Sequence, residues 1–455
     1  TIGGLAATPG TPPGNLISGN GGSGVELSEV TSTNNTVQGN LIGTNATGTA
    51  ALGNFEGIAI GPNGGSNNNL IGGTEVGARN VISGNSNYGI SLSTGDVASS
   101  DNTVQGNYIG PDITGTIALS PNQTGIFFGG GDHSQVGGSA PGAGNLISGN
   151  GQPSTVKPGV YVGGAATGSV FQGNLIGTQA DGLSPLGNSW GGIVLGTTQI
   201  VVGGIGPGEG NVIAFNGKST DPGSGVMVDG ASVTVRGNSI HDNAGLYGLG
   251  IDLSSNGVTP NDSGDADPGP NDLQNFPIVS SVTPLGPGSG TRIQGVLHST
   301  PSTIYDLDFY ANPACSNFPR EFLEGETYLG SSQVSTDGSG TGTFDVTLAA
   351  TIETGARISA TATDPSGNTS EFSQRLPFSI SPTSGPAVTV TAVTIAGTDF
   401  LPGATVTIGG QPATGVNVDS FNSLSASTPA LAAGTVNDVV VTNTDGSRGT
   451  LVKGW

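Results

Sequence analysis

An internal repeat of 65 residues constrains the fold of this chain more than any other feature. The motif Asn-Leu-Ile-Ser-Gly-Asn at residues 15–20 returns, with small changes, at residues 80–85, 145–150 and 211–216, so that successive copies lie 65, 65 and 66 residues apart. A second motif, Val-Gln-Gly-Asn at residues 37–40, has counterparts at residues 104–107, 171–174 and 235–238. Self-similarity at a fixed period of this kind is typical of a solenoid.

Each repeat unit contains a third motif, which sets the expected number of coils. Asn-Leu-Ile-Gly-Gly at residues 69–73 is echoed at residues 135–138 and 201–204. Three motifs per unit predict three turns of about 22 residues each, and therefore about eleven coils in all. At about 4.8 Å per coil, such a rod is expected to be about 50 to 55 Å long.

Short segments with alternating polarity separate the motifs. They include Val25-Glu26-Leu27 and Ile90-Ser91-Leu92. Period-two alternation predicts strands whose apolar residues face inward, while Glu26 and Ser91 face solvent. Such strands are too short to bury enough surface alone, so stability must come from stacking of successive coils.

The repeated Gly-Asn pair has a mechanical interpretation. Glycine readily supplies the left-handed backbone that a tight corner needs. Asparagines one coil apart are then expected to stack as an amide ladder rather than to bind a ligand. The expected pairs are Asn20 over Asn40, Asn85 over Asn107, and Asn150 over Asn174.

The repeats resemble those of right-handed parallel β-helix proteins from bacterial surfaces, in the pectate-lyase-like superfamily. The resemblance covers residues 1–275 and is specific for fold. It implies little about function, because members include lyases, hydrolases, tailspikes and adhesins.

Repetition stops after residue 253, at an acidic, proline-rich segment (residues 261–272) that is expected to cap the last coil. Residues 276–378 alternate as strands, and residues 362–372 resemble the last hairpin of a bacterial Ig-like domain. Residues 379–455 resemble an IPT/TIG domain that ends about one strand early. The sequence therefore predicts an all-β chain, with a right-handed parallel β-helix (1–275) followed by two Ig-like β-sandwich domains (276–378 and 379–455).

Charge and composition exclude several classes of function. Ten Lys and Arg stand against 32 Asp and Glu, giving a net charge of −22 that disfavours nucleic acid as a partner. A single cysteine, Cys315, excludes a disulfide framework and a cysteine-cluster zinc site. No apolar run is long enough for a membrane span, and both ends look cut from a longer parent, so a missing signal peptide or anchor remains an open alternative.

Catalytic residues are not expected. A polysaccharide-cleaving β-helix needs an acid and a base that converge on one face. The best pairs, Asp132-His133 and His241-Asp242, are sequence neighbours, which point to opposite faces of a strand unless they lie in a turn. The sequence favours a protein that is not an enzyme; if it is one, a polysaccharide lyase or a glycoside hydrolase is expected.

One acidic cluster has the residues for metal chemistry. Oxygen ligands spaced two residues apart along a turn can converge on calcium. The cluster lacks the closing glutamate of an EF-hand loop, so an acidic solvated linker is the alternative. The candidate calcium ligands are Asp262, Asp265, Asp267, Asn271 and Asp272.

These observations favour an extracellular structural or adhesive surface protein, with the β-helix as a rigid stalk and the Ig-like domains as spacers or attachment modules. Its partners would be a polysaccharide, a cell-surface ligand or further copies of itself. The alternative is a carbohydrate-active enzyme or a glycan-binding β-helix, with aromatic side chains in a groove. The candidate glycan contacts are Tyr88, Tyr108, Tyr161 and Trp190, with Phe127 beside them; each of them could equally be a core or stacking residue.

Overall fold

The structure is a computed structural model of the whole chain. It describes residues 1–92, 99–119, 122–151, 157–217, 223–244, 248–286, 288–313, 324–353, 356–373, 379–397, 400–420, 423–444, 448–451 and 454–455. Cys315 lies outside these ranges. No helix in the described residues is long and apolar enough to cross a membrane.

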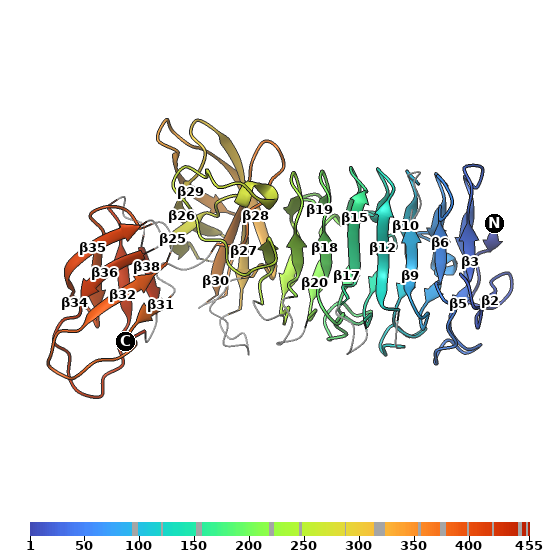
Figure 1. Cartoon of the computed structure of the whole chain (residues 1–455), viewed down its shortest axis with the longest axis horizontal. Helices are drawn as coiled ribbons and strands as arrows, with labels where there is room; N and C mark the ends of the chain where they lie inside the picture. Colours follow the sequence, from blue (N-terminus) through green and yellow to red (C-terminus); the bar gives the residue numbers. More distant parts are fainter. Residues whose placement is uncertain are drawn as a thin grey trace.

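A parallel β-helix forms the N-terminal part of the chain, and two antiparallel sandwiches follow it, as the sequence predicts (Figure 1). Three parallel sheets of eight strands each run along the solenoid, which gives it about seven turns. We call them sheets A, B and C. Successive strands of the chain enter A, B and C in turn, so each coil contributes one strand to every sheet.

The strands of the solenoid are two to seven residues long. Sheet A contains β1 (Ile2–Gly3), β4 (Thr36–Gln38), β7 (Leu70–Gly72), β10 (Thr103–Gln105), β13 (Gln135–Gly137), β16 (Val170–Gln172), β19 (Val201–Gly203) and β22 (Thr234–Arg236). Sheet B contains β2 (Leu16–Ile17), β5 (Leu41–Ile42), β8 (Val81–Ile82), β11 (Tyr108–Ile109), β14 (Leu146–Ile147), β17 (Leu175–Ile176), β20 (Val212–Ala214) and β23 (Ser239–His241). Sheet C contains β3 (Val25–Leu27), β6 (Ile58–Ile60), β9 (Tyr88–Leu92), β12 (Thr124–Gly130), β15 (Val160–Ala165), β18 (Ile193–Leu195), β21 (Val226–Val228) and β24 (Ile251–Leu253). A short 3₁₀ turn, η1 (Val76–Ala78), lies between β7 and β8.

The inward-facing residues form one continuous core. Val25 and Leu27 are buried and Glu26 is exposed, as the alternation predicts. Ile90 and Leu92 also point inward and are fully buried. Ser91 faces outward, but the expectation that it meets solvent is wrong, because it is only 2% exposed and donates a hydrogen bond to the Glu56 carboxylate at 2.7 Å.

Amide ladders are present, but their predicted register is wrong. Asn20 donates to Asn54 at 2.8 Å, and Asn40 donates to Asn80 at 2.9 Å, so Asn20 and Asn40 belong to different ladders. The same holds for the other two pairs, because Asn85 donates to Asn122 and Asn150 to Asn188, whereas Asn107 donates to Asn145 and Asn145 to Asn174. The first ladder is Asn15, Asn40, Asn80, Asn107, Asn145, Asn174, Asn211 and Asn238, and the second is Asn20, Asn54, Asn85, Asn122, Asn150, Asn188, Asn216 and Asn243.

Two coils, not three, make up each repeat unit. The three motifs were expected to occupy three successive turns, but the Val-Gln-Gly-Asn and Asn-Leu-Ile-Gly-Gly motifs pair with each other in sheet A, as Val37 does with Ile71, whereas Leu16 of the first motif lies in sheet B. Ladder neighbours therefore alternate between a long and a short step, such as 40 residues from Asn40 to Asn80 and 27 from Asn80 to Asn107. Eight strands per sheet at about 4.8 Å give a rod of about 34 Å, shorter than the predicted 50 to 55 Å.

Hairpin inserts in alternate coils explain the difference in coil length. Three of them are closed by isolated bridges, between Thr44 and Ala51, Pro111 and Ala118, and Thr178 and Pro185. Their backbones lie over apolar residues that point outward from sheet B: Gly115, in the second insert, lies directly against Leu146. Leu146 is consequently only 2% exposed. The inserts thus cover outward-facing apolar residues of sheet B, among them Leu41 and Leu146.

An Ig-like sandwich follows the solenoid, and we call it the Ig-like domain. The short turn η2 (Pro270–Leu273) precedes it. One sheet contains β25 (Ile278–Pro284), β26 (Thr291–His298) and β29 (Thr341–Leu348), and the other contains β28 (Thr327–Ser335), β27 (Ile304–Asn312) and β30 (Arg357–Thr363).

The last part of the chain is a second sandwich, which lies at the far end of the Ig-like domain from the solenoid (Figure 1). One sheet contains β31 (Ser379–Ser381), β32 (Ala392–Ala396), β36 (Ser423–Ser427) and β35 (Thr414–Ser420). The other contains β34 (Gln411–Pro412), β33 (Thr405–Ile408), β37 (Val439–Thr442) and β38 (Arg448–Leu451). Its core is continuous with Phe276, Ile278 and Val296 from the Ig-like domain and the segment before it.

The Ig-like domain closes the open end of the solenoid, and we call this contact the joint. Phe372 and Tyr310 belong to the same apolar core as the solenoid residues. The edge of sheet B pairs with Gly325, whose N–H and C=O both bond Ile240. The predicted cap, residues 261–272, takes only part in this closure, through Asn271.

Groups from outside the coils meet the ends of the first and second amide ladders. The Asn243 N–H, at the end of the second ladder, donates to the Glu324 carboxylate at 3.2 Å. Beside the end of the first ladder, the Gly237 N–H donates to the Tyr310 hydroxyl at 3.1 Å. At the edge of sheet A, the Asn271 amide accepts from the Val233 N–H and donates to the Val233 carbonyl. The joint therefore continues the hydrogen bonding of the coils instead of interrupting it.

Candidate functional site

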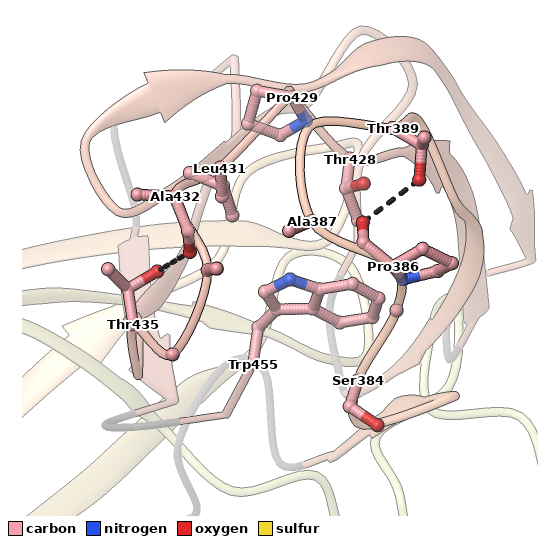
Figure 2. Close-up of a pocket in the computed structure, with 13 residues that line it drawn as sticks. Ser384, Pro386, Ala387, Thr389, Thr428, Pro429, Leu431, Ala432, Thr435 and Trp455 are labelled. Atoms are coloured by element: carbon pink, nitrogen blue, oxygen red, sulfur yellow. Dashed lines mark hydrogen bonds between the residues drawn. The ribbon is translucent and has the colours of Figure 1, made fainter.

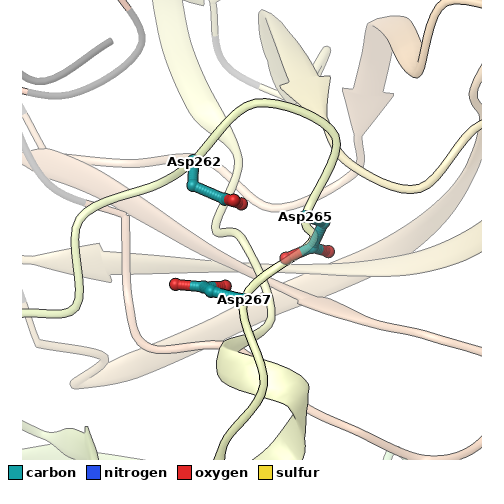
Figure 3. Close-up of side chains that lie close together, drawn as sticks. All are labelled: Asp262, Asp265 and Asp267. Atoms are coloured by element: carbon teal, nitrogen blue, oxygen red, sulfur yellow. The ribbon is translucent and has the colours of Figure 1, made fainter. Parts of the chain in front are cut away.

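Three of the five predicted calcium ligands converge in the turn before the Ig-like domain. Asp262, Asp265 and Asp267 each place a carboxylate oxygen within 4.8 Å of the other two (Figure 3). The turn is fixed by Asn275, whose amide accepts from the Asp262 N–H and donates to its carbonyl oxygen. We call this group the acidic cluster.

The acidic cluster carries unfavourable charge. Burial raises the pKa of Asp265 to about 7, although hydrogen bonds from the Ser299 hydroxyl and the Asn275 backbone N–H lower it, and the charges of Asp262 and Asp267 raise it further. Burial and the Asp262 charge also raise the pKa of Asp267. The Asp267 Oδ1 atom is buried and has no hydrogen-bond partner among the described residues. Oxygen ligands so arranged suit a hard divalent cation.

The other two predicted ligands lie elsewhere. The Asn271 side-chain amide accepts from the Val233 N–H and donates to the carbonyls of Val233 and Thr369, at 2.7 to 2.9 Å. It therefore links the solenoid to the Ig-like domain and helps to close the joint. The Asp272 carboxylate accepts from the Asn368 amide at 3.1 Å. Local spacing could not separate these roles, because it does not show which strand edge passes nearby.

A groove on sheet C gathers three of the four predicted glycan contacts. Tyr88, Tyr161 and Trp190 line it together with Phe127, which lies between the two tyrosines, and its volume is about 560 Å³. Glycines 129, 163 and 164 also line the groove, and Lys157 is the one cationic residue among those that line it. The structure thus forms a hollow with an aromatic wall on an otherwise acidic protein.

The aromatic wall is a stack of rings. Tyr88 and Phe127 have centroids 4.5 Å apart and planes within 9°, and Phe127 and Tyr161 are 5.5 Å apart with planes within 5°. Rings that stack face to face cover one another's faces, so the column presents mainly ring edges and hydroxyl groups to the groove. The fourth candidate, Tyr108, lies on sheet B, where the Arg79 guanidinium sits 4.0 Å from its ring centroid.

The two candidate catalytic pairs have different surroundings. The Asp132 carboxylate accepts from the N–H and hydroxyl of Thr167 in the next coil, at 3.0 and 2.9 Å. It therefore stabilises the contact between the turns of two successive coils. His241 and Asp242 do meet, at 2.9 Å, because Asp242 has a left-handed backbone (φ 54°) that turns its side chain back. Burial lowers the pKa of His241, but the hydrogen bond to Asp242 and the charges of Glu326 and Glu324 outweigh it and raise the pKa. This pair lies in the joint.

A smaller hollow of about 170 Å³ lies in the last sandwich (Figure 2). The Trp455 side chain lies in it, between the Ser384–Thr389 loop and the Thr428–Thr435 loop. Each loop is closed by a threonine, with Thr389 donating to the Pro386 carbonyl at 2.9 Å and Thr435 to the Ala432 carbonyl at 2.8 Å.

Sequence reasoning missed the residues that build the joint. Gln38, Gln105 and Gln172 each donate to a glycine carbonyl in the next coil, at 2.8 to 3.1 Å. Arg236 occupies the fourth equivalent position and instead pairs with Asp306 and Asp308, both at 2.7 Å. The break in the repeat, Val-Arg-Gly-Asn in place of Val-Gln-Gly-Asn, was the available signal. The buried carboxyls of Asp252 and Glu371 also lie in the joint, but no pattern in the sequence pointed to them.

Comparison with protein families places the last part of the chain. Residues 378–453 match the IPT/TIG domain family. Comparison with curated proteins found no match. The last sandwich is therefore an IPT/TIG domain, attached to a β-solenoid through an Ig-like sandwich.

Proposed function

We propose that this protein is an extracellular structural or adhesive surface protein of bacteria, in which the solenoid is a rigid stalk and the two sandwiches serve for spacing or attachment. We also propose that the solenoid belongs to the pectate-lyase-like superfamily of β-helices and that the sandwich after it is a bacterial Ig-like domain. Calcium at the acidic cluster, as a clamp on the turn between the solenoid and the Ig-like domain, is also part of this proposal.

The observation that carries the proposal is the joint. A flexible linker between modules needs few contacts, whereas here the two parts share one core, a salt bridge and a hydrogen-bonded strand edge. Interdomain contacts are usually small and permit motion. A continuous connection of this kind supports a role in which the molecule has to hold its length and direction.

The test is whether the protein is displayed and whether it adheres. Intact cells that express the full-length gene should bind an antibody against the IPT/TIG domain and lose that signal on brief protease treatment. A mutant strain without the gene should attach less to its surface. Equal attachment of both strains, or a signal only after lysis, would contradict the proposal.

The second candidate function is glycan binding, and the groove on sheet C favours it. A hollow with aromatic side chains and a few polar groups is the usual form of a small-ligand site. The protein should then bind glycans on an array. The variants Tyr161→Ala and Trp190→Ala should weaken this binding, whereas Tyr108→Phe, on sheet B, should leave it unchanged. Incubation with pectin, alginate or xylan should release no sugar; release would favour an enzyme.

A further inference from the structure

Two buried carboxyl groups face the same part of the joint. Asp252, in the last strand of sheet C, and Glu371, after the last strand of the Ig-like domain, are 0% and 1% exposed. The Glu371 carboxylate accepts from the N–H groups of Leu253 and Thr259, both at 3.0 Å, and so ties the solenoid's last strand to the Ig-like domain. Asp252 accepts from the Ser224 hydroxyl at 3.1 Å and from two backbone N–H groups in residues 256–257.

Charge in this region is unbalanced. The neighbouring charges that act on the two groups come from other carboxylates, Asp229 on Asp252 and Asp252 on Glu371. Elsewhere in the joint, Arg236 is paired with Asp306 and Asp308, and His241 faces Asp242, Glu324 and Glu326. An uncompensated buried charge is costly, so a pair of such carboxyls favours a state that keeps a proton.

We propose that the joint is controlled by protonation: it is closed while at least one of Asp252 and Glu371 is protonated, and it loosens when both are ionised. Ionisation of both would place two like charges in the interface beside the Phe372 ring, which packs against Tyr310 at a centroid distance of 5.2 Å. Loosening would uncover the last strands of sheets A, B and C together, because the same domain covers all three.

The direction of the pH effect follows from the direction in which the two pKa values are shifted. Burial raises the pKa of Asp252 to about 6, and burial with the Asp252 charge holds the pKa of Glu371 well above its usual range. The folded joint therefore binds more protons than the open one. Its stability is complete in acid and is lost as the pH rises through 6 and beyond.

Energy transfer between two dyes tests this on the full chain. Cysteines replace the exposed Val76 and Ser289 in a Cys315→Ser background, which places one dye on the solenoid and one on the Ig-like domain. Transfer should change between pH 5 and pH 9. Hydrogen exchange at the Leu253 and Thr259 amides, corrected for the intrinsic rate, should rise at least about tenfold, the change that one pKa unit represents.

Variants decide which group responds. Glu371→Gln and Asp252→Asn should each flatten the pH response. Arg236→Gln should loosen the joint at every pH and leave the response in place. An unchanged distance and unchanged exchange between pH 5 and pH 9 would overturn the proposal. So would a response that survives Glu371→Gln and disappears in His241→Gln, because His241 would then be the controlling group.

Discussion

Asparagine suits the corners of this solenoid because one amide accepts and donates at the same time. Asn107 shows the pattern: its Oδ1 accepts from the N–H and the amide of Asn80, and its Nδ2 donates to Asn145 and to the Ile71 carbonyl. Backbone groups that a sharp corner leaves unpaired are satisfied in this way inside the core. The preceding Gly106 adopts φ 67°, which is the conformation that an L-residue avoids.

Removing one ladder amide should therefore be costly. Asn107→Ala leaves the Asn80 N–H and amide without their acceptor, and buried unsatisfied groups cost about 1 to 3 kcal/mol each. We expect the free energy of unfolding to fall by about 3 kcal/mol in chemical denaturation. Asn63→Ala is the control, because Asn63 is exposed in a turn, and its effect should stay within about 0.5 kcal/mol. Equal effects would mean that the ladder contributes nothing.

A glycine series separates backbone strain from close packing. A Cβ on Gly72 (φ 86°) would lie 1.9 Å from the Gln105 carbonyl oxygen, whereas one on Gly19 (φ 77°) would meet nothing. Gly19→Ala should cost about 1 to 2 kcal/mol from the left-handed backbone alone, and Gly72→Ala clearly more. Gly22→Ala, which has neither problem, should be neutral. Melting curves of the three variants should follow this order, and a Gly72→Ala as mild as Gly19→Ala would refute the close packing.

At the scale of elements, the solenoid is built from pairs of coils. The long coil of each pair carries a hairpin that shields sheet B, and hairpins of successive pairs touch, with the Ile113 N–H donating to the Gly48 carbonyl at 3.0 Å. The last coil differs, since Arg236 stands where earlier units have glutamine and joins the coil to the Ig-like domain. One residue thus converts a contact between coils into a contact between domains.

The arginine substitution should have a large effect. Arg236→Gln restores the residue of the repeat but leaves Asp308, whose side chain is 0% exposed, without its bidentate partner. Removing one partner of a buried ion pair lowers the free energy of unfolding by about 3 to 5 kcal/mol. Arg292→Gln, which breaks the exposed pair with Asp345, is the control and should change the melting temperature little. A similar small change in both variants would show that the joint does not depend on Arg236.

Sequence patterns predicted the local strands well, but they predicted poorly which strands and side chains lie side by side. The inward residues of β3 and β9 follow from alternation, and the family resemblance of residues 379–455 is confirmed over residues 378–453. The number of coils was wrong because pairing along a solenoid is non-local: nothing in Val37 or Ile71 alone states that they lie side by side in sheet A. At the candidate site, spacing brought three aspartates together but could not show that Asn271 is occupied by the strand edge.

At the scale of the whole molecule, the chain has a net charge of −22 and concentrates carboxylates where its parts meet. The acidic cluster and the Asp252–Glu371 pair both lie between the solenoid and the Ig-like domain. The pKa is raised for Asp265 and Asp267 in the cluster and for both members of the pair, so these groups hold protons more tightly than an isolated carboxyl. Protons and divalent cations are thus expected to compete for the acidic cluster, whereas the buried pair responds to protons alone.

Calcium at the acidic cluster should therefore stabilise the protein only above neutral pH. The folded-state pKa of Asp265 is about 7, above its ordinary 3.8, so without a cation the contribution of this group to stability is full in acid and is lost between about pH 4 and pH 7. A cation that binds only the folded state opposes that loss, by about 2.7 kcal/mol at a hundredfold excess over the dissociation constant. We expect calcium to raise the melting temperature at pH 8, to have no effect at pH 5, and to lose its effect in Asp265→Ala with Asp267→Ala. Asp272→Ala, outside the cluster, should keep the calcium response. If chelator and calcium give the same melting curve at pH 8, the turn is only a solvated linker, and its carboxylates are kept apart by hydrogen bonds alone.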